Sequence, residues 1–278
     1  MPNILLRGKI IDFSSPLVMA IINCTPDSFF AASRCVGEYA LIDAVETALK
    51  EGADIIDLGG YSTRPGAEFV TPDVEWERIK EALTVIRQRF PQTVISVDTF
   101  RASVAECAVK EFDVDIINDI SGGTLDDNLL PTVAKLNVPY ILMHTRGTPQ
   151  TMQQFTQYDN LIGDMLVYFS EKITLLRQLG FTSDIIIDPG FGFAKTMDQN
   201  YELLKYLSVF DRFKMPILAG VSRKSMVCKL LDCEPSEALN GTTVVNTLAL
   251  LHGANILRVH DVRQAVEAIK ITQKMMWA

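Results

Sequence analysis

Short apolar runs and longer amphipathic stretches alternate along the whole chain. Eight runs of three to five residues are rich in Ile, Val and Leu, and each is followed by Asn, Asp, Gly or His. Such runs, bounded by turn-forming or polar residues, are typical of buried strands. The predicted strands are Val18–Ile22, Ile55–Leu58, Val94–Val97, Asp115–Ile117, Tyr140–Met143, Ile185–Ile187, Ile217–Ala219 and Ile256–Val259.

The segments between these strands have apolar residues three and four positions apart, which predicts helices. They are Tyr39–Glu51, Val74–Phe90, Ala102–Lys110, Asn128–Leu136, Asn160–Leu179 and Asn200–Phe210. Because the strands are apolar at consecutive positions, both faces of each are expected to be covered, which favours a parallel sheet wrapped by helices. Eight such units close an α/β barrel of the (β/α)8 kind. Asn3–Phe13 is predicted to form a short hairpin that caps its N-terminal end.

Length and composition set the class of protein. The 278 residues include 48% hydrophobic and 22% charged side chains, and no linker divides them, so we predict a single domain over residues 1–278. A net charge of −8 disfavours nucleic acid and anionic membrane surfaces as partners. The chain shows neither a signal peptide nor an 18-residue apolar run, and we expect a cytoplasmic protein. Its five cysteines form no Cys-x-x-Cys pair, which argues against a zinc site.

In a barrel of this kind the active site lies at the C-terminal ends of the strands. Every predicted strand end carries polar groups, and we expect them to share one rim. They include Asn23, Asp57, Asp98–Thr99, Asn118–Asp119, His144 with Arg146, Asp188, Ser222–Ser225, and Arg258 with His260–Asp261.

The kinds of residue at these ends indicate what would bind. Cations and hydroxyls after the last two strands, at Arg258, His260 and Ser222–Ser225, occupy the usual phosphate site of a barrel. Asp98, Asp188 and Asn118 could face the N–H groups of a flat heterocycle. Phe193 and Met143 could pack on its ring. Taken alone, Asp188 could equally cap the turn before Pro189-Gly190.

Longer motifs at the same strand ends resemble those of the dihydropteroate synthases. The first two are Ile21–Phe29 and Asp57–Gly66. The others are Ser96–Thr99, Ile117–Gly123, Met143–Pro149, Asp188–Lys195, Ser222–Lys224 and Arg258–Val262. The resemblance therefore covers almost the whole chain and implies an enzyme, a transferase of folate biosynthesis. It would join 6-hydroxymethyl-7,8-dihydropterin diphosphate to p-aminobenzoate and release diphosphate.

The resemblance also implies the roles of individual residues. The pterin would be bound by Asp98, Asn118, Ile120, Met143, Asp188, Phe193, Gly220 and Lys224. The diphosphate would contact Asn23, Arg64, Arg258 and His260, with Mg²⁺ at Asn23. The p-aminobenzoate would contact Phe29, Thr63, Arg64, Pro65 and Ser225. The catalytic residues would be Lys224, Asp98, Arg258 and His260. A homodimer through the helical regions Thr242–Leu251 and Val262–Met275 is also expected.

The implied reaction is a dissociative substitution at the pterin methylene group, in which diphosphate leaves before the arylamine attacks. No strong general base is required, so His260 is expected to contact diphosphate. His252, on a helical pattern, is interpreted as structural, and the role of His144 is left open. One departure from the family pattern is Ala31, which stands where the first loop usually carries an acidic residue. Closure over the diphosphate could instead use Asp27 or Arg34.

Three alternatives differ in class. A methyltransferase that acts on methyltetrahydrofolate with a corrinoid protein would share the pterin carboxylates, but it would not need the loops at Ser62–Gly66 and Ser222–Ser225. A catalytically silent pterin-binding homologue is disfavoured by Asn23 and Lys224, although Ala31 keeps it open. A phosphosugar isomerase would leave the paired acids Asp98 and Asp188 unexplained.

Overall fold

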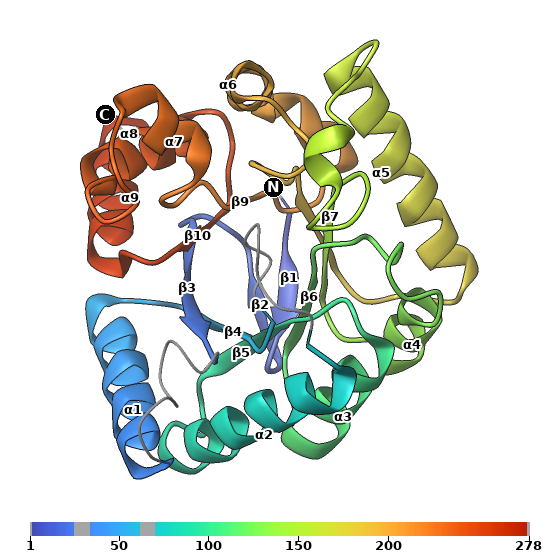
Figure 1. The fold of residues 1–278 in the computed structure, drawn as a ribbon, viewed down its shortest axis with the longest axis vertical. Coiled ribbons are helices and arrows are strands. Elements are labelled where there is room, and N and C mark those ends of the chain that lie inside the picture. The colour runs from blue at the N-terminus through green and yellow to red at the C-terminus, as the bar shows by residue number, and fades with distance from the viewer. Residues whose placement is uncertain (1, 25–33, 62–69, 277–278) are drawn as a thin grey trace.

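The protein is an eight-stranded parallel barrel surrounded by helices (Figure 1). The computed structural model describes residues 2–24, 34–61 and 70–276. Within them the strand order is β8-β7-β6-β5-β4-β3-β10-β9, and a bridge between Ile187 and Ile217 joins the two edges. The strands are β3 (Leu17–Asn23), β4 (Ile55–Gly59), β5 (Val94–Asp98), β6 (Ile116–Asp119), β7 (Tyr140–Met143), β8 (Ile185–Asp188), β9 (Leu218–Ala219) and β10 (Ile256–Val259). The predicted fold class is confirmed.

The helices follow the strands in turn, and local sequence explains where several begin and end. The α-helices are α1 (Arg34–Glu51), α2 (Pro72–Arg89), α3 (Ala102–Phe112), α4 (Leu129–Leu136), α5 (Leu161–Gln178), α6 (Met197–Lys205), α7 (Ser225–Leu231), α8 (Leu239–Leu251) and α9 (Val262–Met276). Thr71 caps α2 ahead of Pro72, and Asn160 caps α5 through its contact with the Gly163 amide. The last helix, α9, packs on both α1 and α8.

One predicted helix differs from the structure, and two further elements were not predicted. The single helix predicted over Asn200–Phe210 is wrong: α6 begins earlier and ends at Lys205, and a separate 3₁₀ helix, η3, covers Leu207–Phe213. A capping box formed by Thr196 and Gln199 fixes the earlier start, because each side chain bonds the other's backbone N–H. A second 3₁₀ helix, η2, covers Met152–Gln154, and neither it nor α7 was predicted.

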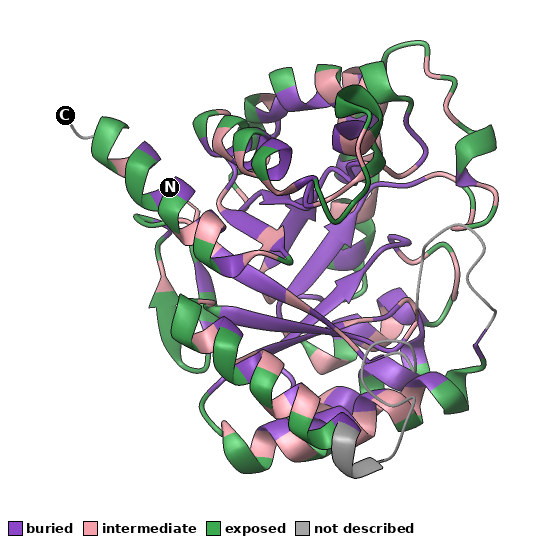
Figure 2. Ribbon diagram, turned by 60° about the vertical axis from the view of Figure 1, so that its left-hand side comes forward, coloured by how far each residue is buried: buried purple, intermediate pink, exposed green. Residues whose placement is uncertain are grey.

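The hairpin predicted before the barrel is present and closes its N-terminal end. It consists of β1 (Ile4–Leu6) and β2 (Lys9–Ile11). Ile4, Leu6 and Phe13 form one apolar cluster with a ring of barrel residues, namely Met19, Ile55, Ile116, Ile141, Ile186, Leu218 and Ile256. Figure 2 shows the barrel strands largely buried, whereas β2 of the hairpin is exposed. This apolar layer closes the N-terminal end of the barrel. A ligand of the barrel interior therefore enters from the C-terminal end.

The period of the strands places the next layer of side chains. Side chains two residues apart on a strand share a face, so the residues two positions after this ring also point into the barrel. They are Ile21, Asp57, Asn118, Met143, Asp188, Gly220 and Arg258. An apolar base therefore supports a second layer that contains most of the charged groups of the candidate site.

Candidate active site

Four residues at the C-terminal ends of neighbouring strands lie in one row. Asn23 pairs with Gly59, Gly59 with Asp98, and Asp98 with Asn118 in the parallel ladder. Gly59 leaves the row open at its centre, since a Cβ atom there would lie 3.8 Å from the Asp98 Cβ and 3.9 Å from the Asn23 Oδ1. Three polar side chains from β3, β5 and β6 thus converge at the mouth of the barrel.

A charged network joins this row to the far side of the barrel. Arg258 on β10 donates from Nε to Asp57 and from an Nη atom to Asp98, both at 2.7 Å. The Asn118 amide also donates to the Asp57 Oδ2, at 3.2 Å. Burial raises the pKa of Asp98, whereas the Arg258 guanidinium opposes that rise. The network fixes two carboxylates and one amide around a single guanidinium.

Asp188 and Lys224 are two further charged groups of the mouth, and their opposite charges influence each other. The Asp188 Oδ1 accepts from the Gly190 N–H at 2.8 Å. Burial lowers the pKa of Lys224 to about 8, and the negative charge of Asp188 opposes that shift. Burial likewise raises the pKa of Asp188, and Lys224 opposes it. The Lys224 ammonium also lies 4.5 Å from the centre of the Phe193 ring, so an acid, a cation and an aromatic face adjoin each other.

The loops after β9 and β10 are tied together at the rim. Ser222 Oγ lies 3.0 Å from His260 Nδ1, and the His260 N–H also approaches the same hydroxyl. Arg223 makes a bidentate contact with Asp261 at 2.9 and 2.7 Å. Since Arg223 is engaged in this way, it is a support for the rim. His260 itself is exposed.

Two residues predicted to share the rim face away from the mouth, so the expectation of a common rim was wrong for them. The Asp119 carboxylate accepts from the Tyr140 hydroxyl at 2.6 Å and from the Ser121 and Gly123 amides. His144 packs against Tyr168 with 4.9 Å between ring centres. Both residues stand one position out of phase with the inward-facing residues of their strands, which points their side chains towards the helices.

Sequence reasoning assigned no role to several buried charged groups beside the site. Asp57 links Arg258 to Asn118, yet sequence showed it only as one polar strand end among eight. Glu75 on α2 forms an ion pair with Arg101 at 2.7 Å and accepts from Thr99 at 2.6 Å. Arg101 also bonds the Val70 carbonyl and lies 5.5 Å from the Tyr61 ring. The burial of Glu75 in α2 and its ion pair with Arg101 become visible only in the fold, since an acid is seldom buried unless it is paired.

The structure therefore brings together most of the predicted pterin residues. Asp98 and Asn118 are joined through Arg258 and Asp57, Lys224 lies over the Phe193 ring, and Gly220 adjoins Arg258. Met143 pairs with Asp188 in the ladder, and Ile120 directly follows β6. Ser225 is exposed at the start of α7. Four residues predicted to bind p-aminobenzoate or diphosphate lie outside the described residues, as does the departure at Ala31: Phe29, Thr63, Arg64 and Pro65.

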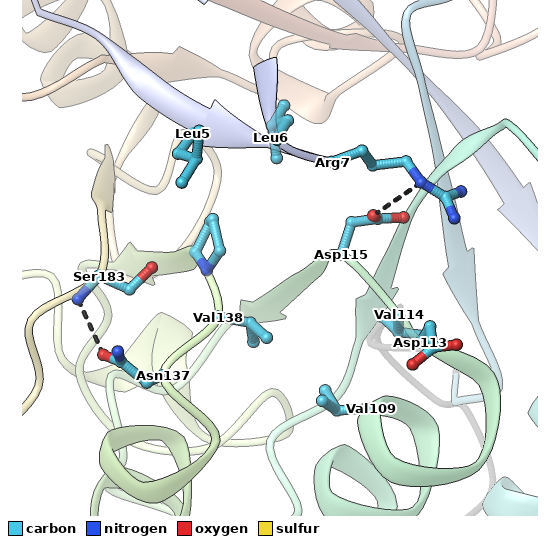
Figure 3. Close-up of a pocket in the computed structure, with 12 residues that line it drawn as sticks. Leu5, Leu6, Arg7, Val109, Asp113, Val114, Asp115, Asn137, Val138 and Ser183 are labelled. Atoms are coloured by element: carbon cyan, nitrogen blue, oxygen red, sulfur yellow. Dashed lines mark hydrogen bonds and ion pairs between the residues drawn. The ribbon is translucent and has the colours of Figure 1, made fainter. Parts of the chain in front are cut away.

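A hollow at the opposite end of the barrel does not compete as the active site. It is lined by the hairpin, by Val109 of α3 and by the segments that lead into β6, β7 and β8 (Figure 3). Its polar groups already have partners, since Arg7 Nε lies 3.6 Å from Asp115, and Asn137 accepts from the Ser183 N–H at 2.9 Å. The apolar layer beneath the mouth separates it from the charged network.

The chemistry of the donor set at Asn23 suits Mg²⁺. The described residues contain no group of three or more His, Cys, Asp or Glu side chains that could hold a metal alone. However, Mg²⁺ prefers oxygen ligands, and it is usually bound by one or two protein groups together with substrate phosphates and water. The Asn23 amide oxygen, at the open end of β3, meets this requirement.

Comparison with known proteins agrees with the geometry. The family model described as pterin binding enzyme matches residues 19–260. Dihydropteroate synthase of Escherichia coli (strain K12) is 41% identical over 276 residues, which cover 98% of this chain and 96% of that protein. The chain belongs to the dihydropteroate synthase family.

Solved structures of this family share the complete fold. The dihydropteroate synthase of Yersinia pestis in a sulfonamide complex superposes with a TM-score of 0.91 at 36% identity, covering 99% of this chain and all of that one. The Vibrio fischeri enzyme gives 0.86 at 41% identity, with 100% and 99% covered. The sequence-based assignment to a transferase of folate biosynthesis is thereby confirmed for the family.

Proposed function

We propose that this protein condenses 6-hydroxymethyl-7,8-dihydropterin diphosphate with p-aminobenzoate, giving 7,8-dihydropteroate and diphosphate. The observation that supports this reaction most strongly is the network of Asp57, Asp98, Asn118 and Arg258 beside the Asp188–Lys224 pair. It sets carboxylates suited to a heterocycle next to cations suited to its leaving group. The solved structure of one relative was determined in the presence of pteroic acid, the oxidised form of this product, and that of another with 4-aminobenzoic acid, one of the two substrates.

The pterin is held by side chains of the inward-facing layer together with residues at the ends of the strands and in the loops that follow them. Asp188 and Asp98 accept from its ring N–H groups, while the Asn118 amide can both donate and accept. Phe193 and Met143 pack on the faces of the ring. Because the Lys224 ammonium adjoins both Asp188 and Phe193, it can donate to an acceptor atom on the same ring edge. Ile120 and Gly220 complete the walls of this slot.

The diphosphate lies at the rim, beside the loops that follow β3 and β10. Arg258 keeps 21% of its side-chain surface exposed although two of its nitrogens are engaged by carboxylates. His260 lies on the neighbouring loop, where Ser222 orients its ring. These groups neutralise the negative charge that grows on the leaving group. Such stabilisation by preorganised charges is usually the largest single contribution to catalysis. Arg64, which lies outside the described residues, is proposed to contact the same diphosphate.

Bond breaking at the pterin methylene precedes bond making. The carbon–oxygen bond to diphosphate breaks, and both of its electrons leave with the diphosphate. A carboxylate about 4 Å from the resulting positive charge, at an effective dielectric near 20, is worth about 4 kcal/mol, on the order of a thousandfold in rate. Asp98 and Asp188 are placed to supply such stabilisation. The p-aminobenzoate nitrogen then bonds the methylene carbon and loses one proton.

p-Aminobenzoate is positioned by the loops around Phe29, Thr63, Arg64, Pro65 and Ser225. Its amine is already nucleophilic at neutral pH, so orientation contributes more than a general base would. Asn23 would hold Mg²⁺, which would supply further positive charge to the departing diphosphate. The enzyme is also proposed to act in the cytoplasm, in keeping with its water-soluble substrates.

Diphosphate release gives a direct test of this function. A coupled assay is run with pterin diphosphate alone and then with p-aminobenzoate added. We expect p-aminobenzoate to accelerate diphosphate release and each diphosphate released in its presence to be matched by one dihydropteroate. No dihydropteroate formed, or no release at all, would exclude the reaction. Chelation by EDTA should abolish turnover and added Mg²⁺ should restore it, whereas EDTA-insensitive turnover would exclude the metal.

The protein is also proposed to act as a homodimer. Helix α8 exposes Val244, Leu248 and Leu251 on one side, with 51%, 38% and 43% of their surface accessible. Helix α9, which packs beside it, exposes Ile271 and Met275. Several large apolar side chains on adjacent helices are typical of a surface that a second copy covers.

None of the helices among the described residues is long and apolar enough to cross a membrane.

A further inference from the structure

A buried lysine lies behind the wall of the active site. Lys195 is only 3% exposed, and its Nζ atom has three partners within hydrogen-bonding distance. It donates to the carbonyl oxygens of Gly190 at 2.9 Å and Phe193 at 3.0 Å, and it lies 3.1 Å from the Nδ1 of His144. The side chain therefore connects the end of β7 with the loop that follows β8.

The histidine in this contact is part of the barrel wall. His144 is 1% exposed, and its ring packs edge-on against Tyr168. Burial lowers the pKa of His144 well below its usual value, and the charge of Lys195 lowers it further, so the ring is neutral. A neutral imidazole has one nitrogen that accepts a hydrogen bond and one that donates. His144 can thus pair with Lys195 in either protonation state of the amine.

The loop held by Lys195 carries two residues of the proposed pterin slot. Asp188 ends β8, and Phe193 lies at the other end of the turn. Gly190 has φ +71°, and a Cβ atom there would lie 2.1 Å from the His144 carbonyl oxygen, so the loop rests directly on β7. Any shift of the Lys195–His144 contact would therefore be transmitted to Asp188 and Phe193.

A second lysine holds the same loop from the side of the mouth. Lys224 bonds the Phe191 carbonyl oxygen and lies over the Phe193 ring. The carbonyl oxygens of Gly190, Phe191 and Phe193 thus all accept from a lysine. Lys224 is placed to touch substrate, whereas Lys195 lies behind the wall beside the outward-facing His144. The two lysines consequently have separate roles.

A purely structural role for Lys195 would be costly to maintain. Burying an amine without full solvation carries a free-energy penalty, which here lowers the pKa of Lys195 to about 7. An apolar side chain of the same length would fill the space without that penalty. It would, however, leave two loop carbonyl groups and the His144 nitrogen without this partner.

We propose that Lys195, together with His144, is a positioning pair that fixes Asp188 and Phe193 for recognition of the pterin ring. The pair acts on the heterocycle half of the substrate and not on the diphosphate half. This inference rests on the proposed function, because it presumes that the mouth binds a pterin.

The test compares the two halves of the substrate on one variant. Lys195→Met is titrated by calorimetry with 6-hydroxymethyl-7,8-dihydropterin and, separately, with inorganic diphosphate. We expect pterin affinity to fall roughly tenfold or more, as losing a buried hydrogen-bond partner implies, while diphosphate affinity changes less than about twofold. Lys172→Met on α5 is the matched control, since this half-buried lysine lies outside the loop. It should leave both affinities unchanged.

Two results would overturn the proposal: unchanged pterin affinity in a folded Lys195→Met protein, or equal weakening of both ligands. Should Lys195→Met fail to fold, His144→Phe provides the second variant, because it keeps the ring packing on Tyr168 and removes the nitrogen partner. It should show the same selective loss of pterin affinity, and wild-type affinity would refute the pair. Failure of the wild-type protein to bind the pterin would instead refute the proposed function.

Discussion

Arg258 and Asp57 form an ion pair across the barrel interior, with 2.7 Å between Nε and Oδ2, although 201 positions separate them in the sequence. The same carboxylate oxygen also accepts from the Asn118 amide. Asp57 is fully buried, while Arg258 retains partial access to the mouth. Asp57 therefore holds the Arg258 guanidinium in place from beneath and has no access to solvent itself.

Replacing Asp57 should damage both stability and catalysis. We expect Asp57→Asn to lower the free energy of unfolding by about 3 kcal/mol, since it leaves Arg258 with one carboxylate in a buried setting. The value of kcat/KM should fall on the order of a hundredfold as Arg258 loses its orientation. Urea unfolding and steady-state kinetics measure the two effects. The exposed pair Lys50–Glu46 is the control, and Glu46→Gln should cost about 0.5 kcal/mol or less. Wild-type kinetics in Asp57→Asn would contradict this role.

Lys224 should set an alkaline limit on activity. Burial lowers its pKa to about 8, so the ammonium loses its proton as the pH rises through that value. If the charge is needed to bind substrate, kcat/KM should fall above about pH 8, and Lys224→Arg should move this limb to higher pH because arginine stays protonated. Lys229→Arg, at an exposed position of α7, is the control and should leave the profile unchanged. An alkaline limb that stays in place in Lys224→Arg would assign it to another group.

Tyr140 should matter for stability alone. Its hydroxyl donates to Asp119 on the outer side of the barrel, away from the mouth. Tyr140→Phe removes one of the donors to a buried carboxylate and should cost about 1–3 kcal/mol of unfolding free energy. The KM values for both substrates should not change. Tyr206→Phe, which alters an exposed phenol, serves as the control. A large effect of Tyr140→Phe on KM would mean that Asp119 faces the site.

The fold was predictable because its signals are local. Each apolar run became a strand, and the errors at the ends were small. Most of the errors at the C-terminal ends arose because the strands extend into polar residues such as Asn23, Asp98 and Asp188. Polar residues at these strand ends indicate where the site of a barrel lies, but they also made the predicted strands stop one residue too early. The helix boundary at Met197 was missed although the Thr196–Gln199 capping box was readable in the sequence.

The sequence predicted that several polar strand ends meet at the mouth, but not which of these side chains contact one another. Counting by twos from the apolar base of each strand would have shown that Asp119 and His144 face the helices. No count along the sequence could have matched Arg258 with Asp57, because that contact depends on the shear of the closed barrel. The Lys195–His144 contact likewise depends on how one loop rests on the neighbouring strand.

The apolar surface of α8 and α9 should mediate self-association. Light scattering at micromolar concentration should give twice the mass of one chain. Leu248→Glu places a charge within the exposed apolar group of α8 and should give the mass of a single chain. Leu175→Glu, on α5, is exposed to a similar degree and should remain dimeric. A monomeric wild-type protein would end the proposal.

Asp98 and Asp188 are proposed to bind the pterin, whereas Arg258 and His260 are proposed to bind the diphosphate. The most direct measurement is calorimetric titration of Asp188→Asn beside the wild-type protein, with 6-hydroxymethyl-7,8-dihydropterin and with inorganic diphosphate. We predict that the variant loses pterin affinity by about tenfold to a hundredfold, the cost of one charged hydrogen bond, and keeps its affinity for diphosphate. Pterin affinity equal to that of the wild type would contradict the account.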